Sequence, residues 1–121
     1  MPIAEEIDKR HKKRNYLIEL LNNYTLELEK KFGNVTVILF GSYARGDFNL
    51  WSDVDIIIIS DVFNKIRFLD RPFLLPELDK QISYSDIICW SYEESKYMLN
   101  KSLWKDALQN SVVIKDDYNL Y

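Results

Sequence analysis

Four consecutive isoleucines, Ile56–Ile59, are the feature that most constrains how this chain can fold. A β-branched run without polar alternation is typical of a strand that is buried on both faces. Two aspartates, Asp53 and Asp55, stand where this strand begins. The run therefore predicts a layered core, and it raises the question of why acids are placed at one end of it.

The rest of the sequence predicts helices alternating with strands. Ser91 and Glu94 have capping-box spacing, Gly33 marks a helix end, and Pro72 and Pro76 prevent one continuous helix between the second and third strands. Helices are expected over about Ile3–Phe32 and Ser91–Asn110, with a short one near Phe63–Leu69; strands are expected over Val35–Phe40, Val54–Ser60, Gln81–Trp90 and Val112–Ile114. This order predicts an α/β (α+β) fold, a small mixed sheet of three to four strands with helices packed on it.

Length and composition predict one soluble domain over residues 1–121. Apolar content is 47% and charged content 29%, which is ordinary for a globular protein. No apolar run approaches the ~20 residues of a membrane span, so we expect a cytoplasmic protein without a membrane partner. A net charge of −3 argues against a surface built for nucleic acid. A single cysteine, Cys89, excludes an internal disulfide and is interpreted as a small buried hydrophobe.

The first predicted helix carries an apolar stripe that a basic segment interrupts. The stripe consists of Ile3, Ile7, Leu17, Leu21, Tyr24 and Leu28. The interruption, Asp8–Arg14, reads DKRHKKR and includes the basic segment Lys9–Arg14. This segment is either a docking patch for an acidic partner or nucleic acid, or a solvated helix face beyond the core, and we favour the solvated face. His11, the only histidine, is given no catalytic role.

The two aspartates at the start of the second strand are two residues apart. Side chains at i and i+2 of a strand point to the same face, about 6.5–7 Å apart. Two such carboxylates repel each other, and no Lys or Arg lies between Asp47 and Asp61 in the sequence. Because Mg²⁺ prefers one or two carboxylates with phosphate oxygens and water, Asp53 and Asp55 predict a metal site.

A glycine and a serine follow the first strand. Phe40, Gly41 and Ser42 resemble a strand-to-helix corner, with Ser42 as the N-cap of a short helix that ends at Gly46. Helix N-termini attract anions, and a glycine allows a phosphate to approach the backbone. If this corner faces the acids, phosphate and metal share one cleft.

The spacing of these residues carries a family resemblance. Gly41-Ser42, ten residues and Asp53-Val54-Asp55 before a buried strand resemble the signature of the DNA polymerase beta-like nucleotidyltransferase superfamily. With Ala44-Arg45-Gly46 inside it, the stretch is similar to the minimal nucleotidyltransferases of prokaryotes. The resemblance implies a nucleoside triphosphate substrate such as ATP, Mg²⁺ (two ions), and phosphate binding at Gly41, Ser42 and Arg45.

The same resemblance implies a third carboxylate from the neighbouring strand. Asp86 is the only acid inside the third strand run, so it takes the role of metal ligand and base beside Asp53 and Asp55. The alternative is a surface aspartate on an edge strand. Glu77 and Asp79 compete for the role, but they precede the strand.

Several neighbouring residues have two interpretations. Arg45 either clamps a phosphate or braces the corner against Asp47 or Asp53. Tyr43 and Trp51 either stack a base or pack the core, whereas Ser52 would orient the acids. For Arg67 and Arg71, triphosphate contacts are the alternative to solvated side chains, which we favour.

The minimal type resembles the antitoxin of gene pairs with a HEPN-type partner, and this implies transfer of AMP to a tyrosine of that partner. One alternative is a non-catalytic protein that neutralises a partner by contact. A further alternative is transfer to a small molecule, and a homo-oligomer is also compatible with the apolar flank of so small a sheet.

Overall fold

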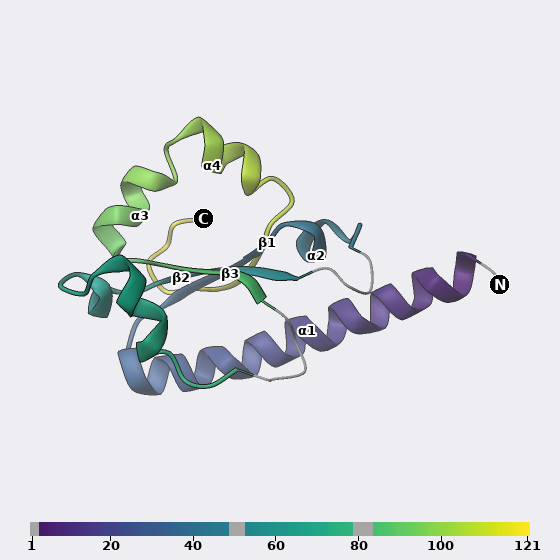
Figure 1. The fold of residues 1–121 in the computed structure, drawn as a ribbon, viewed down its shortest axis with the longest axis horizontal. Helices are drawn as coiled ribbons and strands as arrows, with labels where there is room; N and C mark the ends of the chain where they lie inside the picture. Colours follow the sequence, from purple (N-terminus) through teal and green to yellow (C-terminus); the bar gives the residue numbers. More distant parts are fainter. Residues whose placement is uncertain (1–2, 49–52, 79–83) are drawn as a thin grey trace.

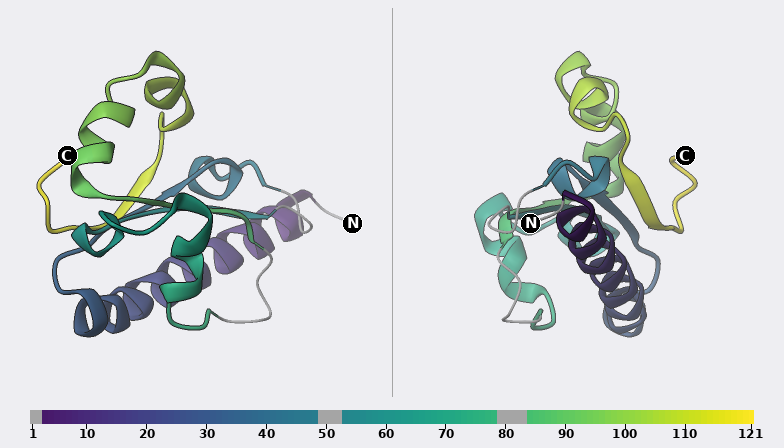
Figure 2. Two further views of the ribbon diagram at one scale, coloured as in Figure 1. Left: turned by 60° about the vertical axis from the view of Figure 1, so that its left-hand side comes forward. Right: turned by 90° about the vertical axis from the view of Figure 1, so that its right-hand side faces the viewer.

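The structure, a computed structural model, describes residues 3–48, 53–78 and 84–121. A four-stranded sheet lies between the long helix α1 on one face and the helices α3 and α4 on the other (Figures 1 and 2). The elements are α1 (Ile3–Phe32), β1 (Thr36–Phe40), α2 (Ser42–Arg45), β2 (Val54–Ile59), the 3₁₀ helices η1 (Asp61–Phe63) and η2 (Phe68–Leu74), β3 (Tyr84–Trp90), α3 (Tyr92–Met98), α4 (Ser102–Ala107) and β4 (Val112–Asp116).

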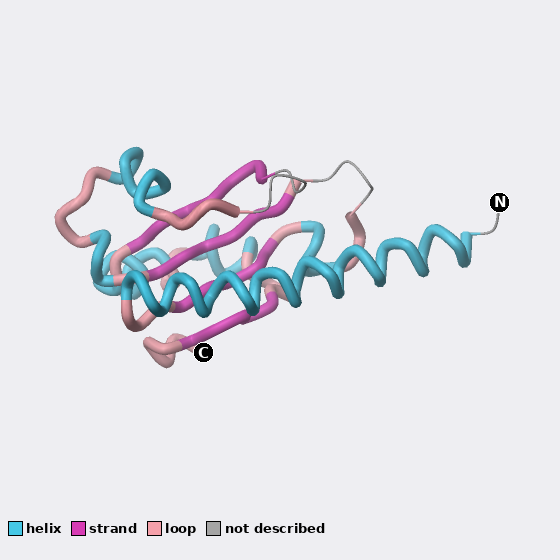
Figure 3. The backbone as a smooth tube through the Cα atoms, turned by 90° about the horizontal axis from the view of Figure 1, so that it is seen from below, coloured by secondary structure: helices cyan, strands magenta, loops and turns pink. Residues whose placement is uncertain are grey.

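The strands lie in the order β3-β2-β1-β4, and Figure 3, viewed from the side of α1, shows this helix running across the sheet in front of the strands. β1 is antiparallel to both β2 and β4, whereas β2 and β3 are parallel. The sheet is therefore mixed, as the sequence predicted. The segment 60–83, which includes η1 and η2, makes the connection between the two parallel strands.

β2 is buried on both faces, and this confirms the interpretation of the isoleucine run. Ile56 and Ile58 belong to the core between the sheet and α1. Ile57 and Ile59 belong to a second core that α3, α4 and the C-terminal tail cover. All four side chains are at most 1% exposed, and each such burial contributes about 1.5–3 kcal/mol. The strand therefore holds the two layers together.

α1 matches its predicted bounds and ends at Gly33, which has a φ of +80°. Leu17, Leu21 and Leu28 of the predicted stripe are buried against the sheet. Ile7 is 44% exposed, so the stripe prediction is wrong for this residue; the N-terminal part of α1 extends past the end of the sheet (Figure 1). No helix in the described ranges, α1 included, is both long and apolar enough to cross a membrane.

The single helix predicted from Ser91 to about Asn110 is wrong, because the structure divides it into α3 and α4. Leu99 and Leu108 both pack on the second core. In a straight helix nine residues correspond to about 900°, so these two side chains would point in opposite directions. The break lets both contact the sheet. The predicted capping box is confirmed: Ser91 Oγ accepts a bond from Glu94 N (3.2 Å), and Glu94 Oε1 accepts one from Ser91 N (2.8 Å).

The short helix predicted near Phe63–Leu69 is also wrong, since the 3₁₀ helices η1 and η2 lie on either side of that range's centre. Pro72 lies inside η2, where its fixed φ suits a short turn. Phe63 of η1 is fully buried and belongs to the core between the sheet and α1.

Arg71 is a buried structural residue, so its interpretation as a solvated side chain is wrong. Only 5% of the residue is exposed. Its guanidinium donates to the carbonyls of Ile66 and Cys89 (2.9 Å each) and to both carboxylate oxygens of Glu94. Arg71 thereby ties η2 to β3 and to the first turn of α3.

We expect Arg71→Met to lower the free energy of unfolding by about 2–3 kcal/mol, because it leaves buried carbonyls without donors while keeping the aliphatic length. Arg67→Met is the matched control. Arg67 pairs with Asp70 at 3.0 Å on the surface, with 87% of its side chain exposed, so its loss should cost less than about 0.5 kcal/mol. Urea unfolding measures both; equal effects would contradict the assignment.

Acid should weaken the same contact. The hydrogen bond from Arg71 is the main reason why the pKa of Glu94 lies below its usual value of 4.5. A lowered folded-state pKa stabilises the fold above the unfolded-state pKa, and this stabilisation disappears as the pH falls through the folded-state value. Wild type should therefore be more stable than Glu94→Gln at pH 7, and the difference in unfolding free energy should shrink below about pH 4.5. Glu93→Gln serves as the control and should show no such convergence.

Candidate active site at the start of β2

Asp55 and Asp86 lie side by side on adjacent parallel strands. Asp55 of β2 is the register partner of Asp86 of β3, and neighbouring strands are about 4.8 Å apart. By the alternation of each strand, both belong to the face that carries Ile57 and Ile59. Asp55 is half-buried and Asp86 is exposed. The structure thus brings together two of the three predicted carboxylate positions.

An irregular register sets this pairing. Val54 pairs with Tyr84, but the next residue, Asp55, pairs with Asp86, so β3 has one extra residue at this point. Such β-bulges occur next to active sites, where they redirect a side chain. Nothing in the sequence predicted this bulge, because the register depends on the pairing of two segments far apart in the chain.

Gly41 packs directly against the carboxylate of Asp55. Gly41 follows β1 with a φ of +76°, and a Cβ placed on it would clash with Asp55 Oδ2. At Gly46, which also has a positive φ (+85°), a Cβ would meet nothing within 4 Å. The predicted meeting of the glycine corner with the acids is therefore present for Gly41 and Asp55, and only a glycine leaves room for it.

The cap of α2 differs from the prediction. Gly41 is the N-cap, and no side chain caps the helix, so the assignment of Ser42 as the N-cap is wrong. Ser42 is instead the first helical residue. Gly41, with a φ of +76° and a ψ of −155°, makes the turn one residue earlier than a serine cap would. Gly46 ends the helix in the left-handed conformation, as the sequence predicted.

Asp53 lies exposed, directly before β2. Among the residues that the structure describes, no three His, Cys, Asp or Glu side chains form a group that could hold a metal ion. The site of three carboxylates therefore stays a prediction. Trp51, Ser52 and the competing Asp79 lie outside the described residues.

Two residues around the corner show one of their two predicted contacts. Arg45 Nε lies 3.1 Å from Asp47 Oδ2, which is the bracing contact, and a phosphate contact of Arg45 stays a prediction. Tyr43 is 2% exposed and stacks on Phe48 at 4.0 Å between ring centroids. Tyr43 therefore packs the core instead of offering a face to a base.

Arg14 is a residue of the site region that sequence reasoning missed. Its guanidinium donates from Nε to the carbonyl of Tyr43 (3.0 Å) and from Nη2 to that of Ala44 (3.1 Å), both in α2. The interpretation of the whole basic segment as a solvated face is wrong for this residue. An arginine within a basic run has no local signal that separates it from its neighbours, because its partners lie about thirty positions away in the chain.

The only cysteine of the chain takes no part in the site. Cys89 is buried, as predicted, and burial raises the pKa of its thiol to about 12. A thiol with this pKa stays protonated at neutral pH, and the thiolate is the reactive form. Cys89 is therefore a packing residue of the core between the sheet and α1.

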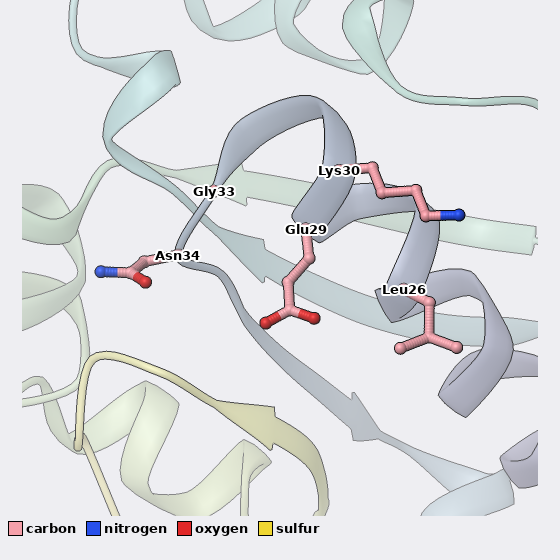
Figure 4. A pocket seen from close by; sticks show the side chains of 5 residues that line it. All are labelled: Leu26, Glu29, Lys30, Gly33 and Asn34. Carbon is pink, nitrogen blue, oxygen red and sulfur yellow. The ribbon is translucent and has the colours of Figure 1, made fainter.

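Two surface hollows lie along α1, away from the acids. One, of about 300 Å³, is lined by Tyr16, Glu19, Leu20 and Asn23. The other, of about 410 Å³, lies at the end of α1 and is lined by Leu26, Glu29, Lys30, Gly33 and Asn34 (Figure 4). The second hollow lies where the chain enters β1, whereas Gly41 lies where it leaves that strand. Neither hollow contains the paired aspartates.

Comparison with known proteins identifies the family. The model of the nucleotidyltransferase domain matches residues 21–114. Two proteins of Methanocaldococcus jannaschii, each named "putative protein adenylyltransferase", are 36% identical over 70 residues and 34% identical over 67 residues. These matches cover 56% and 55% of this chain but only 47% and 60% of the two relatives.

A solved structure agrees with the fold. The crystal structure of a "putative nucleotidyltransferase" from Sulfolobus solfataricus superposes with a TM-score of 0.62 at 23% identity, covering 86% of this chain and 84% of that one. At this identity the likeness concerns the fold alone. The sequence signature, the meeting of Gly41 with Asp55 and the family match agree, and the chain belongs to the nucleotidyltransferase domain family.

Proposed function

We propose that this chain is a Mg²⁺-dependent nucleotidyltransferase that transfers AMP from ATP to a hydroxyl group of a protein. The observation that carries the proposal is the packing of Gly41 against the carboxylate of Asp55, with Asp86 in register on the same face. The names of the two archaeal relatives support a protein as the acceptor.

The donor set suits magnesium. Mg²⁺ binds through one or two carboxylates and completes its shell with substrate phosphates and water. Asp55 and Asp86 are adjacent carboxylates, and Asp53 precedes the same strand. Bound there, magnesium would neutralise the triphosphate and stabilise charge on the oxygens of the reacting phosphate.

Other residues of the chain would bind the triphosphate and accept the proton of the acceptor hydroxyl. The backbone of Gly41 and Ser42 would hold the triphosphate beside the carboxylate of Asp55, which itself fills the space that a Cβ on Gly41 would occupy. The acceptor hydroxyl oxygen forms a bond to the α-phosphorus, the bond from that phosphorus to the bridging oxygen breaks, and pyrophosphate leaves. Asp86, which is exposed, receives the proton of the hydroxyl.

The acceptor that we propose is a tyrosine of a HEPN-type toxin, which makes this chain an antitoxin. Incubation with ATP labelled in the α-phosphate, Mg²⁺ and the protein encoded by the neighbouring gene tests this. Label is expected on the partner. An unlabelled partner, together with a protein that binds Mg·ATP, would rule out this acceptor but leave nucleotide chemistry standing.

Asparagine substitutions test the carboxylates. Asp55→Asn and Asp86→Asn should each lower the rate of transfer by about 10²- to 10⁴-fold, since positioned acid–base and charged groups contribute effects of this size. Asp61→Asn is the matched control: Asp61 is an exposed aspartate just beyond the other end of β2. Its activity should stay within about twofold of wild type.

A double asparagine variant separates catalysis from neutralisation by contact. If the Asp53→Asn, Asp55→Asn double variant still suppresses the partner without labelling it, the protein acts by binding and the enzymatic proposal fails. Loss of both labelling and suppression supports it.

Gly41 and Gly46, which lie at the two ends of α2 and both have positive φ, form a second matched pair. Gly46→Ala should cost about 1–2 kcal/mol of unfolding free energy, because it places a Cβ in the left-handed region. Gly41→Ala should cost at least as much, because its φ of +76° and ψ of −155° lie in a region that is essentially restricted to glycine. Only Gly41→Ala also displaces the Asp55 carboxylate. We therefore expect Gly41→Ala to lose transfer activity while Gly46→Ala retains it, as measured by label transfer at a temperature where both are folded. Equal activities would show that the contact with Asp55 is not needed.

A further inference from the structure

Arg14 connects α1 to the corner where α2 begins. It lies half-buried on α1, and its two hydrogen bonds reach consecutive carbonyls of α2, those of Tyr43 and Ala44. Lys13, the preceding residue, lies with its ammonium 5.7 Å from the centre of the Tyr43 ring. Two adjacent residues of α1 therefore contact the same four-residue helix.

α2 has few hydrogen bonds of its own. Its backbone is closed by Arg45 N to Gly41 O (3.1 Å) and by Gly46 N to Ser42 O (2.9 Å). The last carbonyls of any helix have no partner within the helix, and in α2 these include the two that Arg14 binds. A guanidinium suits this task, because its planar donors can bind two neighbouring acceptors at once and it stays charged at every accessible pH.

The opposite end of α2 is in contact with the acids. The N-cap, Gly41, packs against Asp55 with no room for a side chain. A shift of α2 along or across α1 would therefore either press Gly41 into that carboxylate or open a gap between them. Burial of Tyr43 and Ala44 resists such a shift. The hydrogen bonds from Arg14 are directional, so they also fix the orientation of α2 relative to α1.

We propose that Arg14 is a positioning residue for the nucleotide: it holds α2 so that Gly41 and Ser42 stand at the correct distance from Asp55. This inference rests on the proposed function. Arg14 acts through the backbone of α2, so it is not a catalytic residue.

The test compares Arg14→Ala with Arg10→Ala, a half-buried arginine of the same basic segment one helical turn earlier. Three quantities are measured: the dissociation constant for Mg·ATP, hydrogen exchange of the amides of residues 42–46, and the free energy of unfolding. Arg14→Ala should weaken Mg·ATP binding about tenfold, as expected for the loss of about two hydrogen bonds to the corner. Exchange over residues 42–46 should accelerate, while Arg10→Ala should match wild type in both.

Two further measurements separate positioning from a general loss of stability. Guanidinium, added far below the concentrations that unfold the protein, should restore Mg·ATP binding to Arg14→Ala and leave Gly41→Ala unchanged. Arg14→Lys, which offers a point charge in place of a fork, should give an intermediate affinity. If Arg14→Ala does not fold, Arg14→Lys is compared with wild type instead. Equal Mg·ATP affinity and equal amide exchange over residues 42–46 in these two proteins would overturn the proposal.

The outcomes distinguish this proposal from the function on which it rests. Unchanged Mg·ATP affinity and unchanged exchange in Arg14→Ala would overturn the role of Arg14 even if wild type transfers AMP. If wild type binds no Mg·ATP, the proposed function fails, and Arg14 is no longer a nucleotide-positioning residue whatever the exchange shows. Weaker binding together with faster exchange over residues 42–46 supports both.

Discussion

The burial of β2 on both faces is the constraint on which the rest of the structure depends. Its isoleucines alternate between two cores, so α1 must cover one side of the sheet and α3 with α4 the other. A slip of this strand by one residue would turn Asp55 toward the core beneath α1, where a carboxylate is costly to bury, so the register is strongly favoured. Asp55, which continues the same alternation, is therefore placed as firmly as the isoleucines that follow it. A rigid strand is a suitable support for a group that must meet its partners within a fraction of an ångström.

Features with a local cause could be predicted from the sequence. The isoleucine run, the glycine that ends α1 and the capping box at Ser91 each act within a few residues, and the structure confirms all three. The family also followed from a short stretch, since Gly41, Ser42, Asp53 and Asp55 stand close together in the chain. Local chemistry was sufficient where the physical interaction is local.

Features that depend on distant partners could not be predicted. The break between α3 and α4 follows from the need of Leu99 and Leu108 to reach one core, which their own segment does not reveal. Arg71 and Arg14 look like ordinary surface cations until the carbonyls that they bind are known. The extra residue in β3, which aligns Asp86 with Asp55, likewise exists only once the two strands have paired. The residue types of the candidate site could thus be predicted, but the contacts that hold those residues in place could not.

The position of β3 has a steric consequence. It is the outermost strand on its side of the described sheet, and Asp86 is exposed on it. A substrate group that approaches Asp86 laterally meets a margin of the sheet and displaces no neighbouring strand. An edge of this kind would suit the protein acceptor proposed for this chain, because a tyrosine on the surface of a folded protein could reach a carboxylate there without entering a deep cavity.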